Sequence, residues 1–344
     1  MGCPLLRPLL FALPPETAHA LTLGALQLTG RLPRREPAPP AAPVILAGLT
    51  FPNRVGLAAG FDKSGTAVDG IGHLGFGFLE IGTVTPKAQP GNPPPRVFRL
   101  PQSRALINRL GFPSDGADAV AARLRHRRYR GVLGVNIGKN ATTPNERAVD
   151  DYLQCFETLR SLVGYIAINV SSPNTANLRD LQQADRLGPI LEALVEARAL
   201  VEKSEGRRIP LFLKISPDLA AGDIADIARL IDTLGLDGVI ATNTTTGRDA
   251  ISDEPLASES GGLSGAPLLP VTLATIRRVR SALPRTTIIG CGGILTGGAA
   301  VEMRRAGADL VQIYTGLVYR GPRLVAEAAT ALAVADQRPG HSSI

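Results

Sequence analysis

Tryptophan is absent from the sequence, and aromatic residues make up only 4% of its 344 positions. Proteins that bind single-stranded nucleic acid stack the bases on aromatic side chains, so a nucleic-acid partner is not expected. The three cysteines, Cys3, Cys155 and Cys291, are odd in number and lack metal-ligand spacing, and the four histidines form no metal constellation. Neither a disulfide framework nor a metal site is therefore predicted, and a reducing compartment fits best.

Long apolar runs are also missing, since none approaches the roughly 20 residues that a membrane span requires. The apolar N-terminal stretch is interrupted by Arg7, Pro8 and two further prolines, and it lacks the basic start and cleavage site of a secretory signal. It predicts two short helices, from about Pro4 to Ala12 and from about Glu16 to Leu28. Such a pair can lie in a membrane interface, or it can be a small cap on the main domain; both interpretations stay open.

A proline-rich segment separates this region from the rest of the chain. RLPRREPAPPAAP, residues 31–43, is poor in core-forming residues and typical of an extended connector. We therefore predict three parts: residues 1–43 as an amphipathic helical segment with its connector, residues 44–336 as the main domain, and residues 337–344 as a flexible tail. With 44% hydrophobic residues, the chain can bury a large core.

The net charge of +7 is compatible with nucleic acid, anionic lipid or an acidic small molecule as a partner. The densest basic run, RLRHRRYR at residues 123–130, follows a helix-like pattern before the third apolar run. We interpret it as a solvated helix face rather than a nucleic-acid site.

Beyond the connector, short apolar runs alternate with longer amphipathic segments. The apolar runs begin at Val55, Phe76, Gly131, Tyr165, Pro210, Gly238, Thr287 and Leu310. Strands that are buried on both faces and separated by helices form parallel βαβ units. Eight such units predict a closed (β/α)₈ barrel, the TIM barrel of the α/β class, with a small N-terminal helical extension.

The ends of these predicted strands carry small polar residues. In such barrels the active site is built at the carboxyl ends of the strands. Here the ends read AAGFDKSG, GTVTP, NIGKN, NVSSPN, KISPD, TNTTT, CGGI and YTG. The backbone N–H groups of Gly292, Gly293 and residues 314–316 would form a phosphate site beside a helix N-terminus.

The other strand ends suit a flat heterocycle. Thr83, Asn136, Asn169 and Thr242 offer neutral hydrogen-bonding groups, and Lys214 offers a cation. A cation at the edge of an isoalloxazine ring stabilises the negative charge of a reduced flavin. Lys214 also has two other interpretations, an ion pair inside the barrel and the Schiff-base lysine of an aldolase.

Together with INRLGF at residues 107–112 and GGLSG at residues 261–265, these strand ends resemble the motifs of the dihydroorotate dehydrogenase family, specifically its quinone-linked, membrane-associated class. The resemblance runs from LPPETAH to the last helix. It implies FMN as the bound flavin, (S)-dihydroorotate as substrate, orotate as product and a respiratory quinone as electron acceptor in pyrimidine biosynthesis. We also expect a monomer attached peripherally to the cytoplasmic face of the inner cell membrane.

Carried over position by position, the resemblance assigns residues to two ligands. FMN would contact Ala59, Gly60, Lys63, Thr83, Asn136, Asn169, Lys214, Thr242, Gly265, Gly293, Tyr314 and Thr315. The substrate would contact Lys63, Asn108, Arg109, Leu110, Gly111, Phe112, Asn169, Asn174, Asn243 and Thr244. Orotate is a planar anion with ring amides, so asparagines match its edges and Lys63 matches its carboxylate.

The resemblance also implies individual roles. Ser172 would be the base that removes the C5 proton while hydride leaves C6 for the flavin; soluble relatives use a cysteine there. Because a serine is a weak base, water or neighbouring polar groups must carry the proton onward. His19 and Arg99 would lie near the quinone tunnel.

The chain departs from the family pattern at Pro113–Ser114, at Ala176–Asn177 and at Cys291. The first two lie in loops over the substrate, and we interpret Cys291 as a small buried filler. A Schiff-base aldolase and a non-catalytic membrane adaptor remain as alternative functions, and either protein would be colourless.

Overall fold

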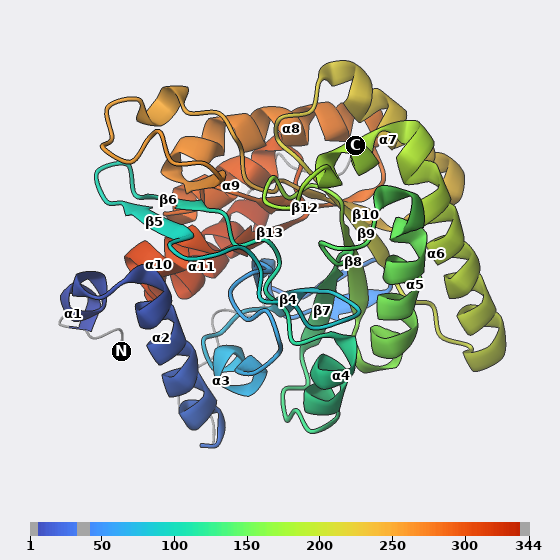
Figure 1. Ribbon diagram of the computed structural model, residues 1–344, viewed down its shortest axis with the longest axis horizontal. Helices are drawn as coiled ribbons and strands as arrows, with labels where there is room; N and C mark the ends of the chain where they lie inside the picture. The colour runs from blue at the N-terminus through green and yellow to red at the C-terminus, as the bar shows by residue number, and fades with distance from the viewer. Residues whose placement is uncertain (1–5, 33–41, 338–344) are drawn as a thin grey trace.

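The computed structural model describes residues 6–32 and 42–337, and its centre is a closed barrel of eight parallel strands (Figure 1). Each strand pairs with the next barrel strand in the chain, and the last pairs with the first. The strands are β3 (Val55–Leu57), β4 (Phe78–Val84), β7 (Val132–Ile137), β8 (Tyr165–Asn169), β9 (Leu211–Ile215), β10 (Gly238–Ala241), β12 (Thr287–Cys291) and β13 (Leu310–Ile313). The predicted TIM barrel is confirmed.

Helices surround this barrel and bury one face each against it (Figure 1). They are α3 (Val68–Gly72), α4 (Ala117–Arg125), α5 (Ala148–Leu159), α6 (Ala184–Glu205), α7 (Ala221–Leu234), α8 (Leu269–Ala282), α9 (Gly297–Ala306), α10 (Thr315–Arg320) and α11 (Arg323–Gln337). In α5, the buried residues Tyr152, Cys155, Phe156 and Leu159 recur at the spacing of one helical face. This amphipathic pattern turns the helix toward the barrel.

A hairpin that the sequence did not predict packs against the amino ends of the barrel strands. It consists of β1 (Val44–Leu46) and β2 (Leu49–Phe51), and its two-residue turn places both Ala47 and Gly48 at positive φ. The Phe51 ring contacts the Phe78 ring edge-on at 5.2 Å. Phe51 is fully buried, so the hairpin covers the apolar interior at this end.

A second unpredicted element is a three-stranded antiparallel sheet. It consists of β5 (Val97–Leu100), β6 (Ala105–Asn108) and β11 (Gly262–Gly265), with β6 in the middle. β5 and β6 lie between β4 and α4 in the chain, whereas β11 follows β10. The sheet therefore joins two distant barrel connections and carries Asn108 and Gly265 to the strand ends.

The two predicted N-terminal helices are confirmed as α1 (Leu6–Ala12) and α2 (Pro15–Gly30), which lie outside the ring of barrel helices beside α3, α10 and β5 (Figure 1). Glu16 forms an ion pair with Arg96 at 2.9 Å, and the ring of Phe11 contacts Tyr319 edge-on. The predicted start at Pro4, most of the connector, Cys3 and nearly all of the C-terminal tail lie outside the described residues.

Several leucines of the N-terminal segment are exposed. Leu9, Leu21, Leu28 and Leu32 are each 55% to 66% exposed. Among the described residues, no helix combines the length and the hydropathy needed to cross a membrane. One side of the segment thus packs on the domain as a cap does, while the other presents leucines as an interfacial helix does.

The basic run at residues 123–130 is not simply a solvated helix face, because α4 ends at Arg125 and the run continues as a loop. The Arg128 guanidinium donates to the carbonyl oxygen of Gly30, at the end of α2, and lies 3.6 Å from Asp69. Part of this run therefore holds α2 against the domain.

A buried carboxyl group occupies the centre of the barrel. Glu80 of β4 is fully buried and accepts hydrogen bonds from the Tyr165 hydroxyl at 2.9 Å, from Gln312 Nε2 at 2.7 Å and from Asn136 Nδ2 at 3.0 Å. Lys214 Nζ lies 3.7 Å from the same group. Four strands thus satisfy a charge that would otherwise be costly to bury.

We predict that Tyr165→Phe destabilises the protein by about 1–3 kcal/mol, because it removes one donor from the buried Glu80 and leaves the ring in place. Urea unfolding of the parent and the variant measures this difference. Ser204→Ala is the control: Ser204 is exposed and bonds only within its own helix, so its effect should stay within about 0.5 kcal/mol. Equal stability of Tyr165→Phe and the control would contradict the prediction.

Candidate active site

A cavity opens at the carboxyl ends of the barrel strands and collects nearly all the residues predicted for the site. From the set predicted for the flavin, it is lined by Ala59, Gly60, Lys63, Thr83, Asn169, Lys214, Thr242, Gly265, Gly293, Tyr314 and Thr315. From the set predicted for the substrate and the base, it is lined by Asn108, Leu110, Gly111, Phe112, Ser172, Asn174, Asn243 and Thr244.

Two predicted residues lie behind or outside this lining. Asn136 is fully buried under Thr83 and Asn169, so it orients lining residues rather than facing the cavity. Arg109 turns outward, forms an ion pair with Glu259 at 2.6 Å and stacks over the ring of Phe98. In this structure the two side chains support the lining, and the predicted ligand contacts of both residues stay predictions.

A chain of amides and a hydroxyl fixes one wall of the cavity. The Thr83 hydroxyl donates to Asn136 Oδ1 at 2.6 Å, and Asn169 Nδ2 donates to both Thr83 Oγ1 and Asn136 Oδ1. Asn243 Nδ2 donates in turn to Asn169 Oδ1 at 3.3 Å. Because each amide has a partner, the orientation of its oxygen and nitrogen toward the cavity is set before any ligand binds.

The opposite part of the lining is a glycine-rich backbone surface. Gly292 and Gly293 follow β12 with φ values of 128° and 89°, a region that favours glycine. A Cβ at Gly293 would lie 2.5 Å from the Cβ of Leu269, so this backbone packs too closely for a side chain. Thr315 begins α10 next to it, and its hydroxyl lies 2.8 Å from that of Ser264. A glycine-rich backbone that lines a cavity beside a helix start suits a phosphate.

Polar side chains at the inner end of the cavity suit a flavin ring. Lys214 and Gln312 both line it, and Gln312 Oε1 is buried without a hydrogen-bond partner in the part of the chain that the structure describes. A cation beside a free acceptor matches a heterocycle that carries carbonyl and N–H groups on one edge. The residues present therefore fit FMN. Gln312 was missed in the sequence because a lone glutamine inside an apolar strand gives no motif.

Lys214 forms an ion pair with Glu80, so the ion-pair interpretation holds, and the lysine also faces the cavity. Cys291 lines the cavity too, and burial raises the pKa of its thiol, with Lys214 opposing this shift. A neutral, buried thiol agrees with the predicted filler role. Among the described residues, no cluster of His, Cys, Asp and Glu side chains is arranged to hold a metal ion.

Lys63 also lines the cavity, and its Nζ donates to the Gly60 carbonyl at 2.8 Å. Burial lowers its pKa to about 8, while Glu16 partly offsets the shift. Burial removes the water that would stabilise the ammonium form of this lysine. A bound anion would stabilise the ammonium form in place of that water.

Ser172 sits in the loop after β8 and is buried apart from its cavity side. Its Oγ accepts a hydrogen bond from the Asn174 N–H at 3.2 Å. Asn174 Oδ1 and Thr175 Oγ1 are buried without hydrogen-bond partners in residues 6–32 and 42–337. Sequence reasoning selected Asn174 but not Thr175, although the dense polar run SSPNT was a signal for both.

Of the two residues predicted for a quinone, His19 belongs to α2 and Arg99 to β5. The rings of His19 and Phe61 meet edge-on at 5.2 Å, and Phe61 contacts Tyr314, a lining residue. Burial, with the nearby Lys63, lowers the pKa of His19 to about 4. Arg99 donates to the carbonyls of Leu10, Phe11 and Leu13 and therefore also holds the turn between α1 and α2.

Comparisons with known proteins agree with these observations. Residues 42–334 match the family model described as dihydroorotate dehydrogenase. Two similar curated proteins are named dihydroorotate dehydrogenase (quinone): one from Chromobacterium violaceum, 54% identical over 96% of this chain and 97% of its own, and one from Pseudomonas aeruginosa, 51% identical over 97% and 99%.

A solved structure shares the whole architecture. The crystal structure of DHODH from Eimeria tenella in complex with ferulenol superposes with a TM-score of 0.86 at 41% identity, covering 92% of this chain and 90% of that one. Its ligand-free form gives a TM-score of 0.84 at 42% identity, covering 92% and 94%. As the strand-end motifs predicted, the chain belongs to the dihydroorotate dehydrogenase family and, within it, to the quinone-dependent enzymes.

Proposed function

We propose that this enzyme oxidises (S)-dihydroorotate to orotate with FMN as its bound hydride acceptor and a respiratory quinone as the final electron acceptor, in pyrimidine biosynthesis. The observation that carries the proposal is the convergence, in one cavity, of neutral amides and hydroxyls, two lysines and a glycine-rich backbone surface. This set matches a flavin phosphate, a flavin ring and a planar anionic substrate together. The names of the relatives support the same substrate and acceptor.

FMN, when bound, supplies the hydride acceptor. Different residues of the chain would bind its phosphate and its ring. Gly292, Gly293 and the start of α10 would hold the phosphate, because all of them line the cavity and the two glycines carry no side chain. Lys214 and Gln312 would meet the polar edge of the ring. Since Glu80 already anchors Lys214, this cation is held in place without rearrangement.

The substrate would lie between Lys63 and the asparagine side chains of the cavity lining. Lys63 would pair with its carboxylate, while Asn108, Asn174 and Asn243 would bind its amide edges. Asn174 Nδ2 donates to Asn108 Oδ1 at 3.0 Å, which leaves the unpartnered Asn174 Oδ1 available as an acceptor. A ring fixed on both edges presents its C5 proton in one orientation.

Ser172 would accept that proton at Oγ. It is buried, in a loop that also carries Thr175, and water or neighbouring polar groups can carry the proton away from the site. The Schiff-base alternative is disfavoured, because Lys214 is committed to an ion pair at the barrel centre and the chain belongs to a family of dehydrogenases.

Electrons would leave the site on the side of α2. The ring contacts His19–Phe61–Tyr314 connect this helix with the cavity lining, and a neutral His19 would suit a neutral quinone. The exposed leucines on the outer side of α1 and α2 would face the membrane that stores the quinone. We accordingly propose a monomer bound peripherally to the cytoplasmic face of the inner cell membrane.

We predict that the purified protein is yellow and that dihydroorotate bleaches it. The Ser172→Ala variant should keep the colour but bleach about 10²–10⁴-fold more slowly, because the proton acceptor is lost while the flavin contacts remain. Anaerobic stopped-flow absorbance measures the reduction rate, and the absorbance ratio of flavin to protein measures FMN content. A colourless protein would refute the proposed function, and an unchanged rate in the variant would exclude Ser172 as the base.

The second prediction concerns pH. Below its pKa of about 8, Lys63 is an ammonium that pairs with the substrate carboxylate, and above it this charge is lost. The KM for dihydroorotate should therefore be flat below pH 8 and rise toward tenfold per pH unit above it. Lys63→Met should raise KM and remove this rise, whereas the exposed Lys87→Met should leave the profile unchanged. A pH-independent KM in the parent would contradict the role of Lys63.

The third prediction separates the two half-reactions. A protein that begins at Pro43 retains every barrel strand end, so FMN binding and reduction by dihydroorotate should persist, while reoxidation by long-chain quinone should be mostly lost. His19→Ala in the full chain should slow reoxidation more mildly. Stopped-flow mixing with quinone measures reoxidation, and flotation with phosphatidylglycerol vesicles measures attachment to the membrane. Undiminished reoxidation after truncation would mean that the helices are only a cap.

A further inference from the structure

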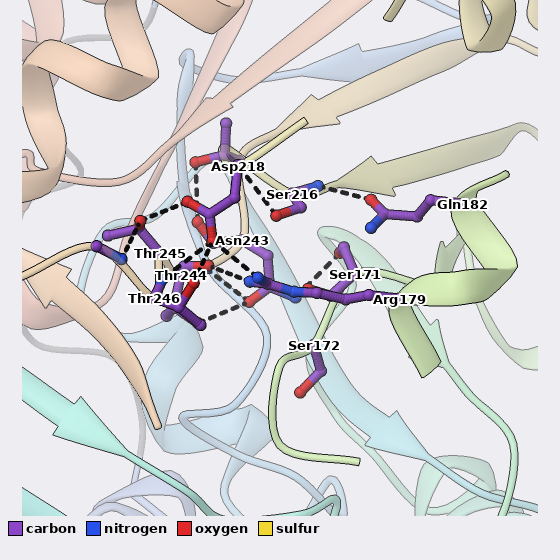
Figure 2. Close-up of polar contacts among 12 residues, drawn as sticks. Ser171, Ser172, Arg179, Gln182, Ser216, Asp218, Asn243, Thr244, Thr245 and Thr246 are labelled. Atoms are coloured by element: carbon purple, nitrogen blue, oxygen red, sulfur yellow. Dashed lines mark hydrogen bonds and ion pairs between the residues drawn. The ribbon is translucent and has the colours of Figure 1, made fainter. Parts of the chain in front are cut away.

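An arginine outside the cavity holds the backbone of the Ser172 loop. Arg179 lies in a short 3₁₀ helix, Leu178–Gln182, that follows this loop. Its Nε donates to the carbonyl of Ser171 at 3.1 Å, and one terminal nitrogen donates to the carbonyl of Thr244 at 2.8 Å. Figure 2 shows the guanidinium reaching between these two loops, which come from β8 and β10. One side chain thus fixes the distance between them.

The remaining guanidinium nitrogen is held by an aspartate from a third loop. Asp218 follows β9, and its Oδ2 lies 2.7 Å from Arg179. The same carboxylate accepts hydrogen bonds from the hydroxyl of Thr245 and from both the N–H and the hydroxyl of Thr246 (Figure 2). Burial acts to raise the pKa of Asp218, but these hydrogen bonds outweigh it and lower the pKa, so the group is ionised at neutral pH.

Neither Arg179 nor Asp218 is among the residues that line the cavity, but the two carbonyl groups that accept from Arg179 belong to a lining residue, Thr244, and to the neighbour of one, Ser171. Ser171 precedes the proposed base, Ser172, and Thr244 lines the cavity itself beside Asn243. The Asn243 amide also donates to the Ser171 hydroxyl at 3.0 Å. The base and the substrate-binding residues therefore share one support, which lies on the outer side of both loops.

We propose that Arg179, anchored by Asp218, is a positioning residue that holds Ser172 in register with Asn243 and Thr244 for proton removal from the substrate. The inference rests on the proposed function and adds the group that sets the distance between base and substrate. A displacement of about 1 Å at a reacting group can cost about 10²-fold in rate, so the contribution of such a support is measurable.

The geometry requires an arginine. Three nitrogens of one planar group meet two carbonyls and one carboxylate, whereas a lysine ammonium at the end of a flexible stem cannot reach all three in that arrangement. The far side of the Ser172 loop is held separately, because Asn92 Nδ2 donates to the carbonyl of Asn174 at 3.0 Å. Loss of Arg179 should thus loosen the loop at Ser171 and Ser172 without releasing it altogether.

The test uses FMN-loaded full-length variants. Arg179→Ala should reduce flavin by dihydroorotate about 10²-fold more slowly than the parent, with FMN content and reoxidation by quinone unchanged. Arg179→Lys should recover only part of this loss. Amide hydrogen exchange should rise in residues 170–178 and 243–246 of the alanine variant. Arg186→Ala is the matched control, because Arg186 pairs loosely with Asp180 at 3.7 Å at the surface, and it should leave all of these measurements unchanged.

A double-mutant cycle decides whether Arg179 acts through Ser172. In the Ser172→Ala background, Arg179→Ala should slow reduction by less than about twofold, because the group that it positions is already gone. The same loss in both backgrounds, full recovery by Arg179→Lys, or a parental rate for Arg179→Ala would each overturn the inference. These outcomes leave the proposed function standing, whereas a parental rate for Ser172→Ala alone would remove its assigned base and the inference with it.

Discussion

The buried carboxyl group of Glu80 is the constraint on which the site depends. A charge at the centre of an apolar barrel is tolerated only when donors surround it, and here they come from β7, β8, β9 and β13. Two of these donors, Lys214 and Gln312, also line the cavity. The core and the site are thus built from the same side chains, and satisfying the carboxyl group fixes the position of the cation that a bound flavin would meet.

Asn136, another donor to Glu80, connects this carboxyl group to the hydrogen bonds of the cavity wall. Because Asn136 Nδ2 is committed to Glu80, its oxygen must face Thr83 and Asn169. Asn169 Oδ1 then accepts from Asn243, and Asn243 reaches the Ser171 hydroxyl. An uninterrupted series of hydrogen bonds therefore runs from the barrel centre to the loop that carries Ser172. Arg179 holds the same loop from outside, so the proposed base lies between an inner and an outer support.

A feature of this fold can be predicted from the sequence when many residues contribute to one repeated pattern, and it is missed when only one or two residues indicate it. Eight apolar runs with polar ends repeat one pattern, so the barrel and the polar strand ends at its mouth follow from the sequence, whereas assignments such as Asn108, Ser172 and Asn174 come from the family resemblance. The β5–β6–β11 sheet was missed because its strands have four residues each and β11 lies far from the other two in the chain. The outward turn of the Arg109 side chain toward Glu259 could not be predicted, because a motif reports residue order and not the side on which a side chain emerges. Arg179 and Glu80 gave no signal, because their partners meet them only once the barrel closes.

The β5–β6–β11 sheet gives the clearest case of one element serving two sides of the molecule. At one end it presents Asn108 to the cavity, and along β5 its Arg99 holds the turn between α1 and α2. Glu16 of α2 pairs with Arg96, directly before β5, and also acts electrostatically on Lys63. A shift of the N-terminal helices would therefore be felt through this sheet and Lys63 at the substrate wall. Coupling between the N-terminal helices and the cavity thus requires no long-range motion, since a single small sheet and one ion pair separate them.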